Sequence, residues 1–378
     1  MTTFIFWACL AVLVYSYAGY PVLVALAALV ARTRPSRGPG GDTPQPSVSI
    51  LLSVFNEEAV IREKIENFLA LDYPPELLEL VVVSDGSTDA TEGLVAGHPC
   101  GRVRLLCQSV RQGKTAALNR AASEAAGDIL VFTDADSMFR PDALRRLAAR
   151  FSSQDVGLVS GRTLYVDPAT GKPLAAGLYR AYEEWIKGYE SEAFSIVGAD
   201  GAIYAMRREL FEPLSPDLIN DFVHTIQVAA KGKRAVSEPD AVCVEPAADS
   251  GADELARQTR IMSQSWHVVV SQLPLLLAAG KTGYVWQLLS HKALRWLSLP
   301  LMAGLLVANV FLAACGPGYG VFLAAQLAAY GGAWAGYRGA GGVFRVSYFF
   351  VLLQVSGILG FVGFVRGRRF VTWNPRAN

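Results

Sequence analysis

The chain has 378 residues, 52% of them hydrophobic, and its mean hydropathy of +0.30 is too apolar for an ordinary soluble domain. The formal net charge is +1, and no run of Lys and Arg is interleaved with aromatic residues, so we do not expect a nucleic-acid partner. The five cysteines are scattered without metal-ligand spacing, so the sequence indicates neither a disulfide framework nor a zinc site. Part of the chain should therefore lie in a membrane.

The N-terminal segment is predicted to be a membrane anchor. Residues 4–30 are almost continuously apolar and uncharged, and that length spans a bilayer. The segment exceeds the apolar region of a signal peptide and lacks a convincing cleavage site, so residues 1–31 should form an uncleaved anchor. Arg32, Arg34 and Arg37 follow, and the positive-inside rule places them in the cytoplasm. A Pro/Gly-rich linker at residues 32–46 then leads into a soluble part.

Residues 47–250 alternate between short β-branched runs and amphipathic helical stretches. Strands are predicted at 48–52, 80–83, 103–106 and 128–133, and the helical stretches at 57–71, 88–96 and 115–126 lie between them. Such alternation indicates βαβ units, with a mostly parallel sheet covered by helices on both faces. The fold class predicted for this domain is therefore α/β and nucleotide-binding.

The C-terminal third changes in character. Residues 251–292 are predicted to form interfacial helices, because Arg257, Arg260 and Trp266 precede a run of Val and Leu. Three crossings are predicted at 293–314, 321–337 and 343–365, before a basic tail at 366–378. This odd count would put the tail outside, against the positive-inside rule. Either the rule fails here, or residues 266–280 also cross, or one of the last segments is re-entrant.

Asp134 and Asp136 stand at the end of the fourth predicted strand. Ligands of open α/β sheets bind outside the carboxyl ends of the strands. Two carboxylates there can share a divalent cation, Mg2+ or Mn2+, that takes its other ligands from water and phosphate. The pair therefore indicates a nucleotide-diphosphate site, although a solvated turn is the alternative.

Three other predicted loops supply candidates for donor binding. Asn56 and Glu57 follow the first strand, and Asp85 follows the second, where its carboxylate could accept from a ribose hydroxyl or a base N–H. The alternative for Asp85 is an Asx-turn before a helix capped by Ser87 or Thr88. Lys114 follows Gly113 at a predicted helix start, which suits a pyrophosphate, although a solvated lysine would also fit. The spacing is not that of a Walker A loop.

In this order, these residues resemble the family 2 glycosyltransferases of the GT-A fold, a group that includes cellulose, chitin, hyaluronan and poly-N-acetylglucosamine synthases. The resemblance covers residues 47 to about 260. It implies that Asp85 binds the nucleoside, that Lys114 lies near the diphosphate, and that Asp134 and Asp136 bind nucleotide and metal. It also implies an inverting, single-displacement reaction.

The resemblance further implies a catalytic base. The family's base belongs to a Glu-Asp motif with a glycine eleven residues after the aspartate, and here Asn220-Asp221 is followed by Gly232 at that spacing. Asp221 is therefore the candidate base, which would take the proton from an acceptor hydroxyl. Asn220 departs from the family's glutamate. Asp221 could also be a helix cap, and capping and catalysis are compatible.

Two more segments concern the acceptor and the diphosphate. Residues 198–208 resemble the family segment that lines the acceptor site, in which Gly198 and Gly201 would admit a sugar and Asp200 would bind it or simply brace a turn. Processive members carry Gln-x-x-Arg-Trp on the interfacial helix, whereas residues 257–261 read Arg-Gln-Thr-Arg-Ile. Arg260 and Arg257 could bind the diphosphate or instead face lipid phosphates. The missing tryptophan argues against processive synthesis.

The expected protein is a membrane-embedded glycosyltransferase with its GT-A domain in the cytoplasm, expected in a bacterial inner membrane. It would move a sugar from a nucleotide-diphospho-sugar, with a UDP-sugar as the first expectation, to a polysaccharide or a polyprenyl-linked lipid. The alternative is a nucleotide-binding transporter or scaffold subunit of a polysaccharide export system without transferase activity.

Overall fold

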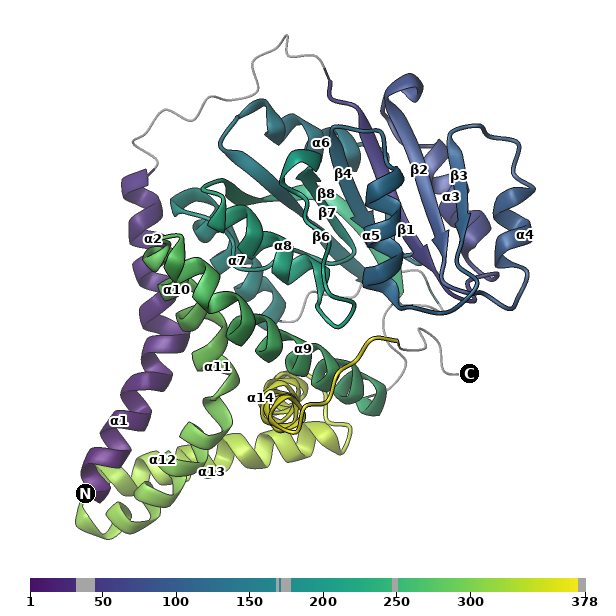
Figure 1. Cartoon of the computed structure of the whole chain (residues 1–378). Coiled ribbons are helices and arrows are strands. Elements are labelled where there is room, and N and C mark those ends of the chain that lie inside the picture. The colour runs from purple at the N-terminus through teal and green to yellow at the C-terminus, as the bar shows by residue number, and fades with distance from the viewer. Residues whose placement is uncertain (32–44, 168–169, 171–177, 247–250, 373–378) are drawn as a thin grey trace.

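The computed structural model describes residues 1–31, 45–167, 170, 178–246 and 251–372. The three arginines after the anchor, most of the linker predicted at 32–46 and the last six residues of the tail lie outside the described residues. An eight-stranded mixed sheet occupies the domain between the anchor and the C-terminal helices (Figure 1).

The sheet has the strand order β3-β2-β1-β4-β7-β6-β8-β5. Its first four strands are parallel: β3 (Val103–Cys107), β2 (Leu78–Ser84), β1 (Val48–Val54) and β4 (Ile129–Thr133). In the other half, β7 (Ile203–Arg207) is antiparallel to both β4 and β6 (Val156–Val166). The long β8 (Arg234–Pro246) is parallel to β6, and β5 (Met138–Phe139) is antiparallel to β8. The prediction of a mostly parallel sheet is confirmed, with β5 and β7 reversed.

The direction of winding changes between β1 and β4. The chain runs outward from β1 to β2 and β3, and then returns to place β4 on the other side of β1. At such a switch point the loops after the two central strands diverge and leave a crevice at the carboxyl edge of the sheet. The loops that carry Asn56 and Asp134 therefore flank one crevice.

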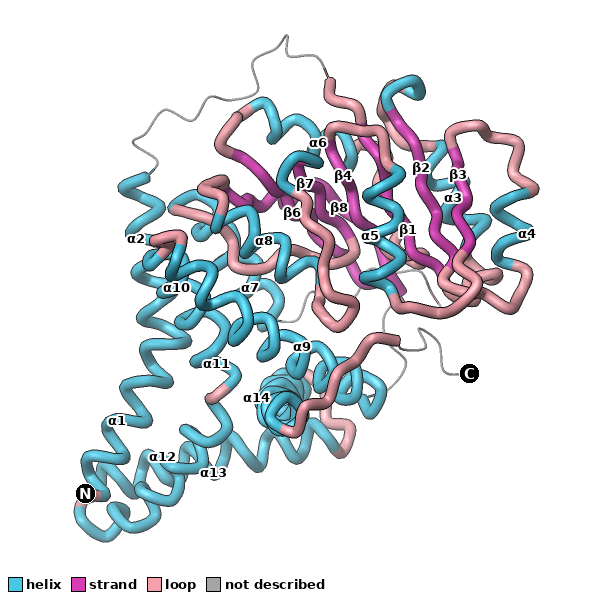
Figure 2. Tube along the Cα trace, viewed as in Figure 1, coloured by secondary structure: helices cyan, strands magenta, loops and turns pink. Residues whose placement is uncertain are grey.

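Strand alternation explains why helices cover both faces. Ile50 and Leu52 of β1 pack in the same cluster as the helices α3 (Ile61–Leu69), α4 (Thr91–Ala96) and α6 (Ala143–Ala149). Leu51 packs instead with α5 (Lys114–Glu124) and α8 (Asn220–Ala230) on the opposite face. Because successive side chains of a strand point to opposite faces, one apolar strand supplies both cores. Figure 2 shows the helical and stranded layers.

The N-terminal anchor is one long helical rod. It consists of α1 (Thr2–Val14), a π-helical turn at Tyr15–Gly19 and α2 (Tyr20–Ala31), and α2 packs against α7 (Leu178–Ala193) of the domain (Figure 1). Within the described residues, three helical stretches are long and apolar enough to cross a membrane: Thr2–Ala31, Ser298–Cys315 and Val343–Val365.

The C-terminal helices differ from the predicted arrangement at one place. Of the apolar stretches, one begins with the helix α12 (Ser298–Leu312) and another coincides with the helix α14 (Val343–Val365). The third predicted crossing, α13 (Pro317–Tyr337), is rich in Gly and Ala and is not among the described helices that are apolar enough to cross a membrane. Before them, α9 (Gly251–Ala278) is one continuous helix that packs along α14. Short elements connect α9 to α12: α10 (Thr282–Leu288), a π-helical turn at Leu289–Ala293 and α11 (Leu294–Trp296).

The basic tail returns to the domain. Arg369 forms an ion pair with Asp217, and Gln264 Nε2 donates a 3.0 Å hydrogen bond to the carbonyl of Phe370. The carbonyl of Val371 lies so close to Gly113 that a Cβ there would be 2.2 Å from it, and Gly113 has a φ of +94°. The end of α14 and the domain therefore lie at the same end of the helical region.

Candidate active site

The loops after β1 and β2 are joined by Asn56. Its side-chain Oδ1 accepts a 2.8 Å hydrogen bond from the backbone amide of Thr88, and the backbone amide of Asn56 donates to Ser87 Oγ at 3.2 Å. Its φ of +55° lies in the left-handed region, which asparagine tolerates better than most residues. Glu57 is buried beside it, and its amide donates to Thr91 Oγ1. These contacts hold the β1 loop in place; donor binding by Asn56 and Glu57 stays a prediction.

Asp85 holds the loop that leads to Lys114. Its carboxylate is 3% exposed and accepts from the amides of Gln112 at 2.7 Å and Gly113 at 2.8 Å. The alternative of a helix capped by Ser87 or Thr88 is wrong, because the N-cap of α4 is Ala90. Asp85 thus connects the β2 and β3 loops below the crevice, and its contact with a nucleoside stays a prediction.

Lys114 and Asp134 meet across the crevice. The Lys114 ammonium, at the start of α5, forms an ion pair with Asp134 Oδ1. Burial alone would lower the pKa of Lys114, but Asp134 and then Asp221 outweigh burial and raise it. The lysine is therefore charged and paired rather than a freely solvated residue.

Asp134 and Asp136 flank the buried Ala135 directly after β4. Among the described residues, no group of three or more His, Cys, Asp and Glu side chains is arranged to hold a metal ion. The residues present still suit a hard cation such as Mg2+ or Mn2+, which keeps several waters and takes phosphate oxygens as ligands. Holding of the metal by Asp134 and Asp136 stays a prediction.

The sequence analysis did not identify two ionisable side chains beneath this turn, the buried Lys64 and the half-buried Glu245. Lys64 of α3 is 3% exposed, and its ammonium donates to Thr133 Oγ1 at 2.8 Å and to the Ser137 carbonyl. Burial lowers the pKa of Lys64 to about 8, although nearby acidic groups partly offset this. Ser137 also donates to Glu245 at the end of β8. Burial, then Asp134, raises the pKa of the Glu245 carboxyl to about 7.

Asp221 lies near the N-terminus of α8, opposite Lys114. Burial raises the pKa of Asp221 to about 6, with smaller contributions from Asp200 and Asp134, while Lys114 opposes the shift. The N-cap of α8 is Ile219, so the alternative that Asp221 caps this helix is wrong. A carboxylate that ionises near pH 6 is suited to accept a proton at neutral pH. Catalysis by Asp221 stays a prediction.

Asn220, in the place of the family's glutamate, connects α8 to α5. Its Oδ1 lies 2.9 Å from Thr115 Oγ1, which donates to it. Below Asp221, the hydroxyl of Tyr204 hydrogen-bonds to His224 Nδ1 at 3.0 Å, and its ring stacks on Phe132 at 4.6 Å. Burial lowers the pKa of His224 to about 3, so the imidazole is neutral. This buried cluster holds α8 on the sheet. Its residues come from β7, α8 and β4, so no local sequence pattern predicts it.

The predicted acceptor segment lies beside Asp221. A Cβ at Gly201 would be 2.9 Å from Asp221 Oδ2, and one at Gly198 would be 3.8 Å from the Phe222 ring. The Asp200 carboxylate accepts from the amide and the hydroxyl of Thr163, at 2.9 and 2.7 Å. Asp200 therefore braces the turn against β6, which was the alternative prediction for it. Acceptor binding by Gly198, Asp200 and Gly201 stays a prediction.

The interfacial arginines belong to α9. Arg257 forms a bidentate pair with Glu254, with both N–O distances at 2.9 Å. Burial, then Arg257, lowers the pKa of Arg260 to about 10, and Asp134 acts in the opposite direction. Asp134 is thus close enough to influence Arg260. The influence of Asp134 favours a position of Arg260 at the crevice over one facing lipid phosphates. Diphosphate binding by Arg260 stays a prediction.

Comparisons with known proteins agree on one group. Residues 49–214 match the sequence model of "Glycosyl transferase family 2". A beta-monoglucosyldiacylglycerol synthase from Synechocystis is 32% identical over 35% of this chain and 28% of its own length. The probable glycosyltransferase YdaM from Bacillus subtilis is 27% identical over 60% of this chain and 57% of its own. The chain thus spans less than two thirds of these curated relatives.

One solved structure is similar over nearly the whole chain. The mannosyltransferase PcManGT from Pyrobaculum calidifontis, in complex with GDP-Man and Mn2+, is 26% identical with a TM-score of 0.72. The match covers 97% of this chain and 100% of that one. Both the α/β domain and the helical segments therefore have counterparts in a single solved protein.

Proposed function

We propose that this chain transfers a sugar from a nucleotide-diphospho-sugar to a lipid-linked or polysaccharide acceptor, and the match of residues 49–214 to the sequence model of "Glycosyl transferase family 2" supports this proposal. The observation that carries this proposal is the meeting of Lys114, Asp134 and Asp221 in one crevice. A cation for the diphosphate and a carboxylate of raised pKa for the acceptor are the two groups that the reaction needs.

The donor half of the reaction falls to the residues around Asp134. Asp134 and Asp136 would hold Mg2+ or Mn2+, and the bound metal neutralises charge on the leaving diphosphate. Lys114 would exchange Asp134 for a phosphate oxygen, and Arg260 would bind a second one. Asp85 keeps the loop of Lys114 in position through its two backbone hydrogen bonds.

The acceptor half falls to Asp221. A bond forms between the acceptor oxygen and the anomeric carbon while the bond from that carbon to the diphosphate breaks, and the acceptor's proton passes to the Asp221 carboxylate. Attack opposite the leaving group inverts the anomeric configuration. Gly201 leaves the space next to Asp221 Oδ2 that an incoming hydroxyl requires.

The nucleotide and the acceptor are the finer parts of the proposal. The sequence resemblance favours a UDP-sugar, whereas PcManGT was solved with GDP-Man and Mn2+, which makes GDP-mannose the second donor to test. A lipid acceptor is supported by the name of the Synechocystis relative, a synthase of a glucosylated diacylglycerol. The changed interfacial motif at residues 257–261 favours single transfer over processive synthesis.

The proposed membrane arrangement places the domain at the cytoplasmic face of a bacterial inner membrane. Thr2–Ala31 would cross once, and α12 and α14 would cross in opposite directions, with α13 as the re-entrant segment. The contact between Arg369 and Asp217 supports this even number of crossings after the domain. The arginines at 366, 368 and 369 then satisfy the positive-inside rule.

A donor screen tests the proposal. Purified full-length protein is incubated with UDP- and GDP-sugars, with and without Mg2+ or Mn2+, and release of nucleoside diphosphate is measured. We expect metal-dependent release with one donor class, and a loss of at least about 100-fold in Asp221→Asn with nucleotide affinity retained. Unchanged turnover in Asp221→Asn would instead support a nucleotide-binding transporter or scaffold. Metal-independent release would contradict the role of Asp134 and Asp136.

A further inference from the structure

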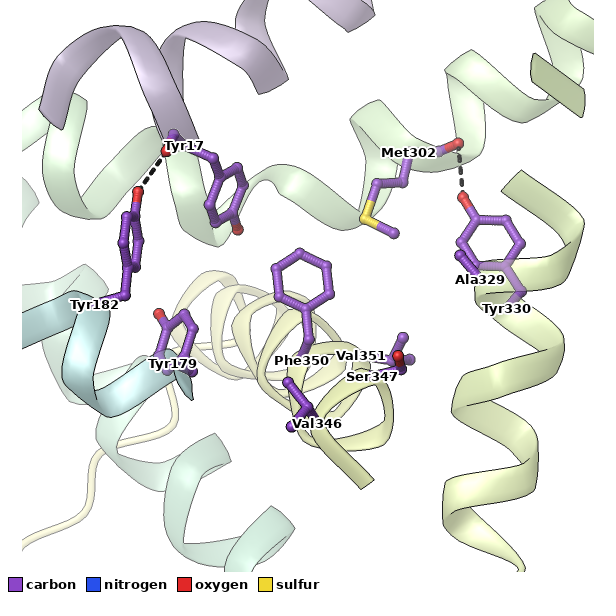
Figure 3. A pocket seen from close by; sticks show the side chains of 10 residues that line it. All are labelled: Tyr17, Tyr179, Tyr182, Met302, Ala329, Tyr330, Val346, Ser347, Phe350 and Val351. Atoms are coloured by element: carbon purple, nitrogen blue, oxygen red, sulfur yellow. Dashed lines mark hydrogen bonds between the residues drawn. The ribbon is translucent and has the colours of Figure 1, made fainter. Parts of the chain in front are cut away.

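A cavity of about 400 Å3 lies among the helices (Figure 3). The residues that line it do not belong to the loops that form the crevice. This volume is within the range of about 300–1,000 Å3 found for ligand pockets. The cavity is open on one side and is lined by residues of the π-helical turn at Tyr15–Gly19, α7, α12, α13 and α14. Its walls are mainly aromatic: Tyr17, Tyr179, Tyr182, Tyr330 and Phe350, together with Met302.

The hydroxyls of three of the four tyrosines that line this cavity have hydrogen-bond partners in the protein. Tyr182 donates to the Tyr17 carbonyl at 2.5 Å (Figure 3). The Tyr17 hydroxyl lies 3.1 Å from Ser298 Oγ. The Tyr330 hydroxyl accepts from Gln326 Nε2 at 2.9 Å. Because these polar atoms are satisfied, the walls present ring faces and aliphatic groups. The ligand that fits such walls is apolar.

A buried ion pair stiffens one wall. The guanidinium of Arg295 is 5.0 Å from the centroids of both the Tyr17 and Tyr182 rings, and it pairs with Glu183 of α7. Arg295 is 4% exposed. Cation–π contacts of this kind hold aromatic rings in fixed orientations. These contacts hold the Tyr17 and Tyr182 side of the cavity in place.

The helix α7 connects the cavity to the crevice. Tyr179 lines the cavity, and the next residue, Arg180, stacks over the Tyr165 ring at 4.0 Å. Burial raises the pKa of Tyr165 to about 12, with Glu245 and Arg257 among the nearby charges. Glu245 in turn accepts from Ser137, the residue after Asp136. Arg180, Tyr165 and the end of β8 therefore lie between the Tyr179 side of the cavity and the turn of Asp134 and Asp136.

We propose that the cavity binds the hydrocarbon chain of a lipid acceptor, whose polar head lies at the crevice on the side of Arg180. This inference rests on the proposed glycosyltransferase function. The helices α12 and α14, which are apolar enough to cross a membrane, form two of the walls, so the source of an apolar chain is the bilayer itself. The arginine at the crevice end suits a phosphate or hydroxyl head.

Photolabelling tests the site directly. Full-length protein in lipid nanodiscs is labelled with a polyprenyl phosphate that carries a diazirine on its chain, and the labelled residues are mapped by mass spectrometry. We expect labels at Met302, Tyr330 or Phe350, competed by excess unlabelled polyprenyl phosphate. A parallel sample uses a diazirine diacylglycerol, and the lipid whose label is competed and which also accepts sugar identifies the acceptor.

A matched pair of variants on α13 separates the cavity from its surroundings. Both positions are exposed, but Ala329 lines the cavity and Leu327 does not, so Ala329→Trp adds an indole to the cavity wall and Leu327→Trp adds the same side chain outside it. We expect Ala329→Trp to lower labelling and raise the KM for the lipid at least about tenfold, with Leu327→Trp unchanged in both. Ser347→Leu, which fills the cavity from α14, serves as a second variant if Ala329→Trp does not fold.

Three results would overturn the inference. The first is labelling confined to bilayer-facing residues, and the second is equal labelling by a diazirine phosphatidylglycerol without competition. The third is normal lipid KM in Ala329→Trp and Ser347→Leu. If no donor yields nucleoside diphosphate with the unaltered protein, the proposed function fails, whatever the labelling shows. Nucleoside diphosphate release without cavity labelling contradicts only the lipid site.

Discussion

Asp221 lies in an environment that determines at which pH it can act. Because its pKa is raised to about 6, chiefly by burial, the carboxylate is ionised and basic only above that pH. We expect kcat/KM to fall about tenfold per pH unit below pH 6, as for a single essential base. The measurement is a pH profile of nucleoside diphosphate release. If Glu245→Gln shifts the pH at which kcat/KM begins to fall, the ionising group is Glu245, whose pKa is raised to about 7, and the assignment of Asp221 as the base is wrong.

The same shift affects stability in the opposite direction. A carboxyl with a raised pKa binds its proton more tightly in the folded state than in the unfolded one. Its contribution to stability is therefore present at low pH and is lost as the pH rises through about 6. The Tm of Asp221→Asn should depend less on pH between 4 and 7 than the Tm of the unaltered protein, which calorimetry measures. Identical pH dependence of the two Tm values would mean that Asp221 is not shifted.

Gly201 tests the geometry of the base. A Cβ at this position would lie 2.9 Å from Asp221 Oδ2, so Gly201→Ala must displace the carboxylate. A shift of about 1 Å in a reacting group can cost about 100-fold in rate, and we expect a loss of that order in kcat/KM with donor affinity unchanged. Gly93→Ala in α4, where no atom lies within 4 Å of the added Cβ, is the control. Equal activity of both variants would mean that Asp221 is not needed in its present position.

At the scale of elements, Lys64 couples the helix α3 to the turn of Asp134 and Asp136. Lys64→Met removes the donor for Thr133 Oγ1 and the Ser137 carbonyl and leaves both buried acceptors unpaired. We expect a loss of roughly 1–3 kcal/mol in the free energy of unfolding, measured by urea titration, and weaker binding of metal and nucleotide. The matched control is Arg62→Met, on the exposed face of the same helix. Full nucleotide affinity in Lys64→Met would show that the turn does not depend on it.

Periodicity explains which elements could be predicted from the sequence. The strands β1 to β4 are short apolar runs bounded by polar loops, and their predicted ranges fall within or next to the observed ones. Lys64 was missed although it lies in the buried stripe with Ile61, Ile65 and Phe68. Its acceptors are Thr133 at the end of β4 and Ser137 just before β5, which are 69 and 73 residues away along the chain. The contact of Glu245 with Ser137 likewise depends on the pairing of β5 with β8, which local pattern does not encode.

At the scale of the whole molecule, the long N-terminal rod and α14 have different main packing partners and meet at the ring contact of Tyr17 with Phe350. The rod of α1 and α2 packs against α12 and α7, whereas α14 packs against α9 and α13 (Figure 1). Hydropathy indicated the apolar segments but not their order in space, because neighbouring helices rather than the sequence of each helix determine packing. The position of the tail follows from tertiary contacts alone.

The position of the tail predicts the topology of the protein. Arg369 pairs with Asp217, and Phe370 accepts from Gln264, so the carboxyl end must lie on the same side of the membrane as the domain. We expect a C-terminal epitope tag to be digested by protease in inside-out vesicles and protected in spheroplasts, and a tag on Met1 to show the reverse. The Met1 tag serves as the internal control, because Thr2–Ala31 is long and apolar enough to cross once, and a single crossing would separate Met1 from the domain. Digestion of the C-terminal tag in spheroplasts would require an odd number of crossings and would contradict the contact between Arg369 and Asp217.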